Sequence, residues 1–464
     1  AAERYPQATY TIFEGASRTF GQVRDAANRV ANFLASRGIE KGDRVAIFLP
    51  NIPHYPEVFF GILKAGATAV TCNPMYKASE LAFQLKDAGA KAVFVMDHPQ
   101  FYPLVKEAIQ DSDVTTVVVC SVGPFLPKLK GFIGGLLGKI PTAGPLDPGH
   151  VRFKDIVAAS APTPPAVQID PLEDVAIILY TGGTTGVPKG ATLSHANLLS
   201  NAKNALQWIR ISQTPGAPRE TLKPGGFHTF LGVLPWYHSF GMTLCLLCSA
   251  ASASALVCIP DPRAGTPPFT KVLEAVQKYR CTMVVGVPTI YSAFVNHPNL
   301  DRFDLTSIQA CGSGGAPLPV EVIKQFEAKT GAVIFEGYGL TETSPMLTVN
   351  PTNLEQRRIG AVGLPLPGTD VKILDLSTGL QELPQGEDGE IAANGPQVMK
   401  GYWGRAEADE EVFRTVAGRR YFLTGDIGHL DEDGFVVITD RKKDLILVGG
   451  FNAYPKEIEE VLFT

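Results

Sequence analysis

Residues 174–190 read DVAIILYTGGTTGVPKG, an apolar run that leads directly into a loop of four glycines, three threonines and one lysine. Glycines let backbone N–H groups approach an anion closely, threonine hydroxyls add further donors, and Lys189 adds a mobile positive charge. A Walker A loop requires Gly before its lysine and Ser or Thr after it, whereas Pro188 and Gly190 flank Lys189 here. The stretch therefore predicts a strand followed by a phosphate-binding loop of another kind.

The sequence before this loop alternates apolar strands with amphipathic helices. Residues 19–38 predict a helix, because apolar side chains recur there at helical spacing and Gly38 provides a stop. That apolar face consists of Phe20, Val23, Ala27, Val30 and Leu34. Strand patterns at 44–49, 67–72, 91–96 and 115–120 then alternate with helical patterns at 55–66, 79–89 and 102–110. Such alternation favours a parallel α/β sheet covered by helices on both faces.

After about residue 359 the pattern changes to short β-rich stretches with frequent Gly and Pro, as at 362–374 and 389–396. The last 40 residues read as a hairpin, a charged connector and the start of a new unit that ends as its helix begins. We expect an α/β fold in which residues 1–358 form layered α/β subdomains and residues 359–440 a small β subdomain. Residues 441–464 would be the hinge and truncated beginning of a smaller α+β C-terminal domain.

Composition indicates a folded, multi-domain protein with small-molecule partners. The chain has 464 residues, a formal net charge of −5, 19% charged residues and 45% hydrophobic residues. These values argue against disorder and against a nucleic-acid-binding surface. The seven cysteines are scattered, and the Cys245 and Cys248 pair has no second pair or nearby histidine to complete a zinc site. We expect buried, reduced thiols and a cytoplasmic protein.

Two apolar segments raise the question of membrane contact. Residues 242–259 carry no charge, but their middle is Ser and Ala, which favours a buried helix followed by a strand over a transmembrane helix. Residues 125–139 can place six large apolar side chains on one helical face beside three lysines. That segment is either an interfacial helix, peripheral at the inner face of a membrane, or a surface loop packed on the protein body. We favour the packed loop.

Four further segments accompany the glycine-rich loop in a fixed order. They are LPWYHSFGM (234–242), CGSGGAPLP (311–319), EGYGLTETSP (336–345) and YFLTGDIGHLDEDGFVVITDRKKDLILVGGFNAYPKEIE (421–459). Together the five motifs resemble the acyl-adenylate-forming superfamily of acyl-CoA synthetases, peptide-synthetase adenylation domains and insect luciferases. The residues of the first and last of these motifs are most similar to those of bacterial long-chain fatty acyl-CoA ligases. Many relatives carry serine where this chain has Gly183, which removes one hydroxyl donor and leaves the backbone cradle intact.

The resemblance implies an ATP-dependent, two-step reaction. A fatty acid carboxylate attacks the α-phosphate of ATP to give acyl-AMP and pyrophosphate, and the thiol of CoA then displaces AMP. Such a site works by positioning its reactants and neutralising phosphate charge, with Mg²⁺ as a cofactor. Two alternatives stay open: an adenylating enzyme that takes an aromatic or medium-chain acid or loads a carrier protein, and a nucleotide-binding module that senses or hydrolyses ATP.

The resemblance also implies roles for individual residues. Those assigned to ATP or AMP binding are Thr181, Gly182, Gly183, Thr184, Thr185, Gly186, Lys189, Gly314, Gly315, Ala316, Tyr338, Gly339, Thr341, Asp426 and Arg441. Within this set, Lys189 is a movable clamp on the β- and γ-phosphates, Tyr338 lies against adenine, and Asp426 accepts hydrogen bonds from the ribose. The three small residues at 314–316 form a wall that admits the flat base.

The remaining implied roles concern the metal, the acid and the movable domain. Glu342 and Thr184 would hold Mg²⁺, which prefers oxygen ligands. The acyl group would lie against Trp236, Tyr237, His238, Phe240 and Gly241. The residues assigned to catalysis are His238, Thr341, Glu342 and Lys189. Lys443 would be the hinge about which the C-terminal domain rotates between the two half-reactions.

Overall fold

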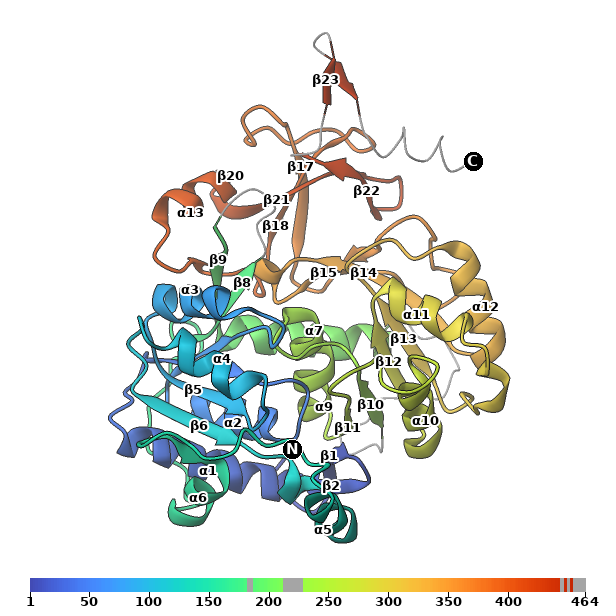
Figure 1. The fold of residues 1–464 in the computed structure, drawn as a ribbon. Helices are drawn as coiled ribbons and strands as arrows, with labels where there is room; N and C mark the ends of the chain where they lie inside the picture. Colours follow the sequence, from blue (N-terminus) through green and yellow to red (C-terminus); the bar gives the residue numbers. More distant parts are fainter. Residues whose placement is uncertain (182–186, 212–227, 443–445, 449–450, 454–464) are drawn as a thin grey trace.

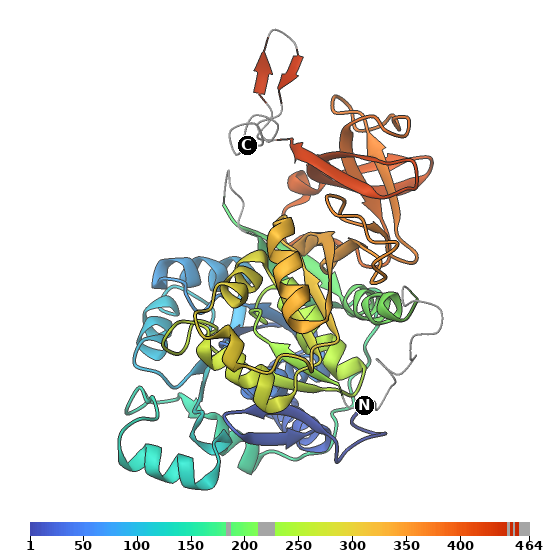
Figure 2. The ribbon, with the colours of Figure 1, turned by 90° about the vertical axis from the view of Figure 1, so that its right-hand side faces the viewer.

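A computed structural model of the protein describes residues 1–181, 187–211, 228–442, 446–448 and 451–453 (Figure 1). Two α/β sheets form the larger, lower part of the molecule in this view, and a third sheet of residues 370–441 lies above them. The view turned by 90° shows the same arrangement, with the hairpin of β23 (Ile446–Val448) and β24 (Phe451–Ala453) projecting from the upper end (Figure 2). The α/β fold with an added β sheet confirms the expected class.

The first sheet has eight strands among the described residues, in the order β19-β9-β8-β4-β3-β5-β6-β7. Its strands are β3 (Arg44–Phe48), β4 (Thr68–Thr71), β5 (Ala90–Met96), β6 (Thr116–Cys120), β7 (Val151–Arg152), β8 (Val175–Thr181), β9 (Lys189–Ser194) and β19 (Gly401–Tyr402). Strands β3 to β8 pair in parallel, whereas β9 is antiparallel to both β8 and β19. The predicted alternation of strands and helices is confirmed.

Helices cover both faces of this sheet, as the unbroken apolar strands require. They are α1 (Phe20–Ser36), α2 (His54–Lys64), α3 (Ala78–Ala88), α4 (Phe101–Ala108) and α6 (Phe153–Ala159). Along β3, Val45 and Ile47 join the apolar core that contains α1 and α2, while Ala46 and Phe48 join the core that contains α3 and α4. All five residues of the predicted apolar face of α1 are buried.

The second sheet has nine strands in the described part of the chain, in the order β16-β15-β14-β13-β12-β10-β11-β1-β2. They are β1 (Thr9–Phe13), β2 (Ala16–Thr19), β10 (Thr229–Gly232), β11 (Ala255–Cys258), β12 (Met283–Gly286), β13 (Ala310–Ser313), β14 (Val333–Gly339), β15 (Met346–Val349) and β16 (Leu364–Pro365). The accompanying helices are α7 (His195–Ile211), α10 (Thr270–Tyr279), α11 (Pro288–Val295) and α12 (Val320–Thr330). The central strands β11 to β14 are parallel, and β15 turns back antiparallel to β14.

The third sheet is antiparallel and is built from the region in which the sequence predicts β structure. Its strands are β17 (Asp370–Leu374), β18 (Gly389–Asn394), β20 (Phe413–Val416), β21 (Arg419–Leu430) and β22 (Val436–Arg441), with α13 (Ala406–Val412) before β20. The predicted hairpin near residue 430 is the β21–β22 pair. Two short strands from the same region, β16 and β19, join the other two sheets instead. The domain limits at residues 358 and 440 remain predictions.

The two apolar segments singled out in the sequence have different outcomes. The predicted buried helix and strand at 242–259 are confirmed by a π-helical turn (Met242–Leu247), α9 (Cys248–Ala251) and β11. Within the described residues no helix has the length and apolar character needed to cross a membrane.

The seven cysteines are buried free thiols, as expected.

Residues 125–139 do not pack on the protein body as expected. After a short 3-10 turn (Gly123–Phe125), residues Lys128–Leu136 form α5, and no side chain of this helix is buried. Phe125, Leu126 and Ile140, which flank the helix, pack partly against the core. The segment is therefore anchored at its two ends while the apolar side chains between them face solvent.

Candidate active site

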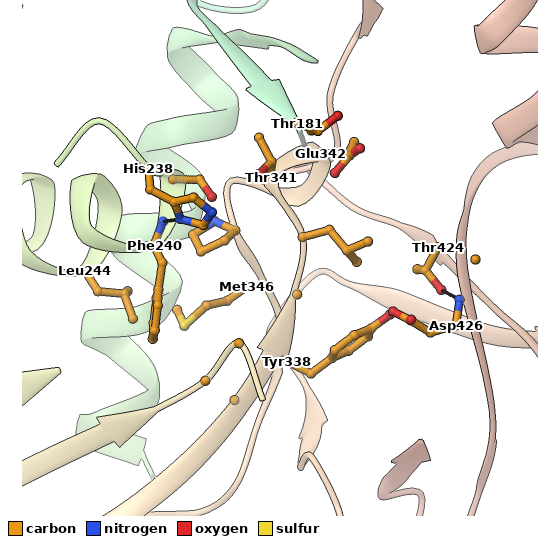
Figure 3. Close-up of a pocket in the computed structure, with 18 of the residues that line it drawn as sticks. Thr181, His238, Phe240, Leu244, Tyr338, Thr341, Glu342, Met346, Thr424 and Asp426 are labelled. Carbon is orange, nitrogen blue, oxygen red and sulfur yellow. Dashed lines mark hydrogen bonds between the residues drawn. The ribbon is translucent and has the colours of Figure 1, made fainter. Parts of the chain in front are cut away.

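A pocket of about 800 Å³ opens where the three sheets meet. Its walls come from the ends of β8 and β9, from the loop after β13, from β14 and the 3-10 turn Thr341–Thr343, and from β21 and β22. In Figure 3, Phe240, Leu244 and Met346 lie on one side of the pocket, and Thr424 and Asp426 lie on the other. The site therefore has an apolar end and a polar end.

The polar end is organised around Asp426 on β21. The Tyr338 hydroxyl donates a hydrogen bond to Asp426 Oδ2 at 2.6 Å, and Arg441 Nε lies 3.2 Å from Asp426 Oδ1. Asp426 and Arg441 are register partners on β21 and β22, so the sheet itself sets this ion pair. Burial raises the pKa of Tyr338 well above its usual value, and the adjacent carboxylate raises it further. The phenol is therefore a hydrogen-bond donor at physiological pH.

Glu342 is a buried carboxylate in the 3-10 turn that follows β14. Tyr402 Oη donates a hydrogen bond to Glu342 Oε1 at 2.8 Å, and the Glu342 carbonyl accepts one from the Met399 N–H at 2.8 Å. Burial raises the pKa of Glu342, while the bond from Tyr402 and the charge of Lys189 oppose that rise. Among the described residues no three His, Cys, Asp or Glu side chains form a metal cluster. One carboxylate can still suit Mg²⁺, because that ion usually keeps waters and takes further oxygens from phosphates.

Lys189 begins β9, directly after the glycine-rich loop, and its side chain is 38% exposed. Its Nζ lies 3.5 Å from Glu411 Oε2 of α13 and 5.3 Å from the centre of the Tyr402 ring. Thr181 at the end of β8 donates a long hydrogen bond from Oγ1 to the Lys189 carbonyl at 3.4 Å. The loop residues Gly182, Gly183, Thr184, Thr185 and Gly186 lie outside the described residues. The structure thus places both ends of the loop, and the Lys189 side chain, at the pocket.

Glycines allow close approach of the backbone segments that line the pocket after β13 and at the end of β14. A Cβ added at Gly339 would lie 1.8 Å from the Pro345 carbonyl oxygen, so only glycine fits where β14 meets the turn back to β15. Gly315 has φ +85°, a conformation that favours glycine, and a Cβ at Gly314 would lie 3.2 Å from Phe240 Cζ. Gly314, Gly315 and Gly339 line the pocket. Ala316 is exposed and is not among the lining residues.

His238 and Phe240 lie together at the apolar side of the pocket (Figure 3). The Phe240 N–H donates a hydrogen bond to His238 Nδ1 at 3.3 Å, which fixes the imidazole at the start of a short helical turn. Solvent reaches His238 through the pocket, but the surrounding protein atoms lower the pKa of its imidazole. The side chain is therefore expected to be neutral near pH 7.

Three of the predicted acyl-binding residues lie away from the pocket lining. Trp236 is fully buried, with its ring 5.7 Å from Tyr55 in an edge contact and its carbonyl accepting a hydrogen bond from Tyr55 Oη. This packing gives Trp236 a place in the core. Tyr237 and Gly241 are also absent from the lining, whereas Ser239 is part of it. A Cβ at Gly241 would lie 2.2 Å from the Pro235 carbonyl oxygen, so this glycine permits the tight turn that presents His238.

The apolar end borders a second, wholly apolar cavity of about 30 Å³. Leu244, Phe335, Met346 and Val349 line both spaces. The far wall is formed by Ala205, Leu206, Trp208, Ile209, Phe230, Cys248, Met283 and Val285. An apolar group that enters past Phe240 would therefore meet only apolar side chains beyond it.

Sequence reasoning missed several residues of the site. Tyr402, Thr424 and Lys442 line the pocket, and Glu411 is the partner of Lys189. Tyr402 reaches the site because β19 pairs with β9, more than 200 residues earlier in the chain. A two-residue strand has no periodicity, so no local pattern could reveal that pairing. The predicted hinge residue, Lys443, lies outside the described residues.

Comparison with known proteins gives matches along nearly the whole chain. A profile of the family described as AMP-binding enzyme matches residues 1–403. Long-chain-fatty-acid–CoA ligase of Bacillus subtilis is 36% identical over 468 aligned positions, which cover 100% of this chain and 79% of the relative. Feruloyl-CoA synthase of an Amycolatopsis species is 33% identical over 470 positions, covering 100% and 81%. The relatives therefore share extended sequence similarity but carry names for different acids.

A solved structure shows the same fold. ATP-bound MatB from Rhodopseudomonas palustris superposes with a TM-score of 0.79 at 30% identity, covering 98% of this chain and 79% of that one. The similarity extends over both α/β sheets and the third sheet, since nearly all of this chain is included. The likeness thus includes all the described elements that form the pocket.

Proposed function

This chain belongs to the AMP-binding enzyme family and is an acyl-adenylate-forming CoA ligase, and on that premise we propose that it activates a long-chain fatty acid. Family membership confirms the resemblance inferred from the five motifs. In the proposed reaction, a fatty acid carboxylate displaces pyrophosphate from ATP, and CoA then displaces AMP from the acyl-AMP. The proposal concerns the identity of the acid and the roles of individual residues.

The observation that carries the proposal is that a polar pocket and an apolar cavity lie side by side and share four lining residues. ATP is polar and charged, and the hydroxyl, carboxylate and lysine groups lie at one end of the pocket. A fatty acid has one polar group and a long apolar tail, and beyond Leu244 the second cavity is lined only by apolar side chains. In Figure 3, His238 lies beside Phe240 and Thr341 lies between them and Asp426, so the carboxylate would meet the α-phosphate near His238 and Thr341. Transfer of the tail from water to this environment is favourable.

The polar residues have complementary roles in this scheme. Asp426 accepts hydrogen bonds from the ribose hydroxyls, Arg441 adds a charged donor, and Tyr338 lies against the adenine. Lys189 and the loop that precedes it hold the β- and γ-phosphates, so their charge stabilises the departing pyrophosphate. Glu342 would hold Mg²⁺, which would neutralise phosphate charge in the transition state. Thr341, next to Glu342, donates a hydrogen bond at the α-phosphate.

The apolar cavity is too small, as it stands, to hold a long acyl chain. About 30 Å³ is roughly the volume of one water molecule, so a long chain enters only if side chains move. Met283 and Met346 line the cavity, and methionine is the most adaptable apolar side chain. We therefore expect the acyl chain to open its own path by displacing these two side chains.

A panel of carboxylic acids tests the proposal. The purified protein is incubated with ATP, Mg²⁺, CoA and hexanoate, palmitate or ferulate, and both pyrophosphate and acyl-CoA are measured. We expect palmitate to give the highest kcat/KM, with one pyrophosphate released for each acyl-CoA formed. A preference for ferulate would assign an aromatic acid instead, as the name of the Amycolatopsis relative would suggest. Acyl-AMP without acyl-CoA, or orthophosphate release independent of any acid, would reject the proposed reaction.

A further inference from the structure

Helix α5 exposes a continuous apolar stripe. Of the fourteen large hydrophobic side chains that are exposed in the described part of the chain, five lie between residues 129 and 137, with exposed fractions from 45% to 78%. They are Leu129, Phe132, Ile133, Leu136 and Leu137. Their spacing is i, i+3, i+4, i+7 and i+8, which places them on one face of a helix. Such clustering on a surface marks an interaction site.

The opposite face of the same helix consists of glycine. At 100° per residue, Gly131 and Gly134 lie on the side away from the stripe. A Cβ added at Gly134 would lie 3.3 Å from Ile140 Cγ1, and one at Gly131 would lie 3.4 Å from the Gly123 carbonyl oxygen. The glycine face therefore lies against Gly123 and Ile140, which flank the helix in the chain, and the large apolar face points outward. This is the reverse of a surface helix that packs on its own core.

Positive charge borders the stripe. Lys128 and Lys130 flank it on its two sides by the same helical geometry, and Lys139 follows the helix. The sequence contains no Asp or Glu from residue 114 to residue 146. Lys130 pairs with Glu14, whereas Lys128 and Lys139 have no ion pair with a described carboxylate. An apolar stripe between lysines is the pattern of a helix that lies in a lipid interface, with lysine side chains reaching back to phosphate groups.

A cleft beside the start of this segment adds more cations. It has a volume of about 410 Å³ and is lined by Pro124 and Phe125 on the α5 side and by Arg18, Arg152 and Lys154. Arg18 and Arg152 are paired with Glu57 and Asp97, and Lys154 has no ion pair among the described residues. The cleft, which Glu57 also lines, therefore adds one cation without a described ion-pair partner, Lys154, beside the helix.

We propose that α5 and the residues that flank it, 125–139, dock the protein on an anionic lipid bilayer. The helix would lie parallel to the membrane plane, with its five apolar side chains below the phosphate groups and its lysines at their level. In Figures 1 and 2, α5 lies at the end of the molecule opposite the third sheet. The candidate active site, which the third sheet helps to form, thus faces away from the bilayer. The inference does not depend on which acid the enzyme uses.

Vesicle sedimentation tests the proposal directly. The protein is mixed with vesicles of phosphatidylcholine alone or of phosphatidylcholine with phosphatidylglycerol, and the bound fraction is measured at low and high salt. We expect binding to the anionic vesicles that weakens with salt, because exposed charges are screened. The double variant Phe132→Ser with Leu136→Ser should reduce that binding about tenfold or more. Lys128→Glu with Lys139→Glu should reduce binding to anionic vesicles only.

A matched control is the variant Leu354→Ser with Leu380→Ser, which changes two comparably exposed leucines elsewhere on the surface. It should bind vesicles as the wild type does. Pyrophosphate release with a soluble short-chain acid should stay unchanged in the α5 variants, since the helix is remote from the pocket. Unaltered vesicle binding by the Phe132 and Leu136 variant would overturn the proposal. The proposal would also be overturned if the wild type does not bind vesicles but is a dimer in light scattering without lipid, and the Phe132 and Leu136 variant is a monomer. The stripe would then contact a second copy of the chain.

Discussion

Replacement of Tyr402 by phenylalanine should shift the pH dependence of adenylation upward. Tyr402 Oη donates to Glu342 Oε1 at 2.8 Å, and this bond favours the ionised carboxylate. Burial already raises the pKa of Glu342, so loss of the bond raises it further. The proposed metal-binding role requires the carboxylate form. The variant should therefore need a higher pH than the wild type to reach the same activity.

The size of the shift follows from the strength of the bond. A hydrogen bond to a charged group contributes about 1.5–3 kcal/mol, and one pKa unit corresponds to about 1.4 kcal/mol. The acid limb of kcat/KM should thus move up by about one to two pH units. Phenylalanine keeps the ring near Lys189 Nζ, so the ring contact to that ammonium is retained. Well above the limb, Glu342 is ionised in both proteins and their activities should converge.

The assay is acid-dependent pyrophosphate release across pH at two Mg²⁺ concentrations. Because metal and proton compete for one carboxylate, more Mg²⁺ should move the acid limb of the variant back down. A merely damaged site would lose activity at every pH and would not respond in this way. Tyr421→Phe is the matched control, since Tyr421 Oη donates to Asp370 Oδ2 at 2.6 Å within the third sheet and neither residue lines the pocket. An unmoved acid limb, or higher activity at low pH, would refute the reasoning.

Three other substitutions have distinct expected results. Burial raises the pKa of Glu57 to about 7 from 4.5, so between these pH values the folded protein binds a proton that the unfolded protein has lost. The free energy of unfolding therefore falls as pH rises from 4.5 to 7, and Glu57→Gln should remove this fall. In urea unfolding, the free energy of unfolding of the variant minus that of the wild type should increase by about 3 kcal/mol between pH 4.5 and 8. A difference that does not change with pH would contradict this. Asp426→Asn should lower kcat/KM for ATP about 10- to 100-fold, because it removes a charged acceptor, and an unchanged value would exclude a role at the ribose. Leu244→Trp should fill the entrance to the apolar cavity and lower kcat/KM for palmitate at least about tenfold more than for hexanoate; equal losses would place the acyl chain elsewhere.

Local patterns in the sequence predicted most of the first sheet correctly. The helix expected at 19–38 is Phe20–Ser36, and it begins with a capping box in which Thr19 and Gln22 exchange hydrogen bonds. The apolar run at 91–96 became β5, Ala90–Met96. Both elements depend on spacing within a few residues, which the sequence displays directly. Contacts between sheets have no such signature: Tyr338 and Asp426 are 88 positions apart, and Tyr402 and Glu342 are 60 apart.

The error at 125–139 has a different cause. Helical spacing of Leu129, Phe132 and Leu136 correctly indicates an apolar face, but periodicity cannot show which way that face points. We expected the segment to be a surface loop packed on the protein body. The structure supplies the missing information: Cβ atoms added at Gly131 and Gly134 would lie 3.4 and 3.3 Å from Gly123 and Ile140, so the glycine side is the one that faces the flanking residues. A glycine face opposite an apolar stripe is a signal that sequence analysis can use.

The segment 399–403 explains how the site holds its charged groups together. The Met399 N–H bonds to the Glu342 carbonyl, the Lys400 N–H to the Thr192 carbonyl, and the Trp403 N–H to the Gly190 carbonyl. The first bond fixes the turn that carries the buried carboxylate, and the other two fix the strand that begins at Lys189. The Tyr402 side chain lies between this turn and this strand: its hydroxyl donates a hydrogen bond to Glu342, and Lys189 Nζ lies over its ring. A short strand with little stability of its own thereby sets the separation between a carboxylate and an ammonium that must act on the same triphosphate.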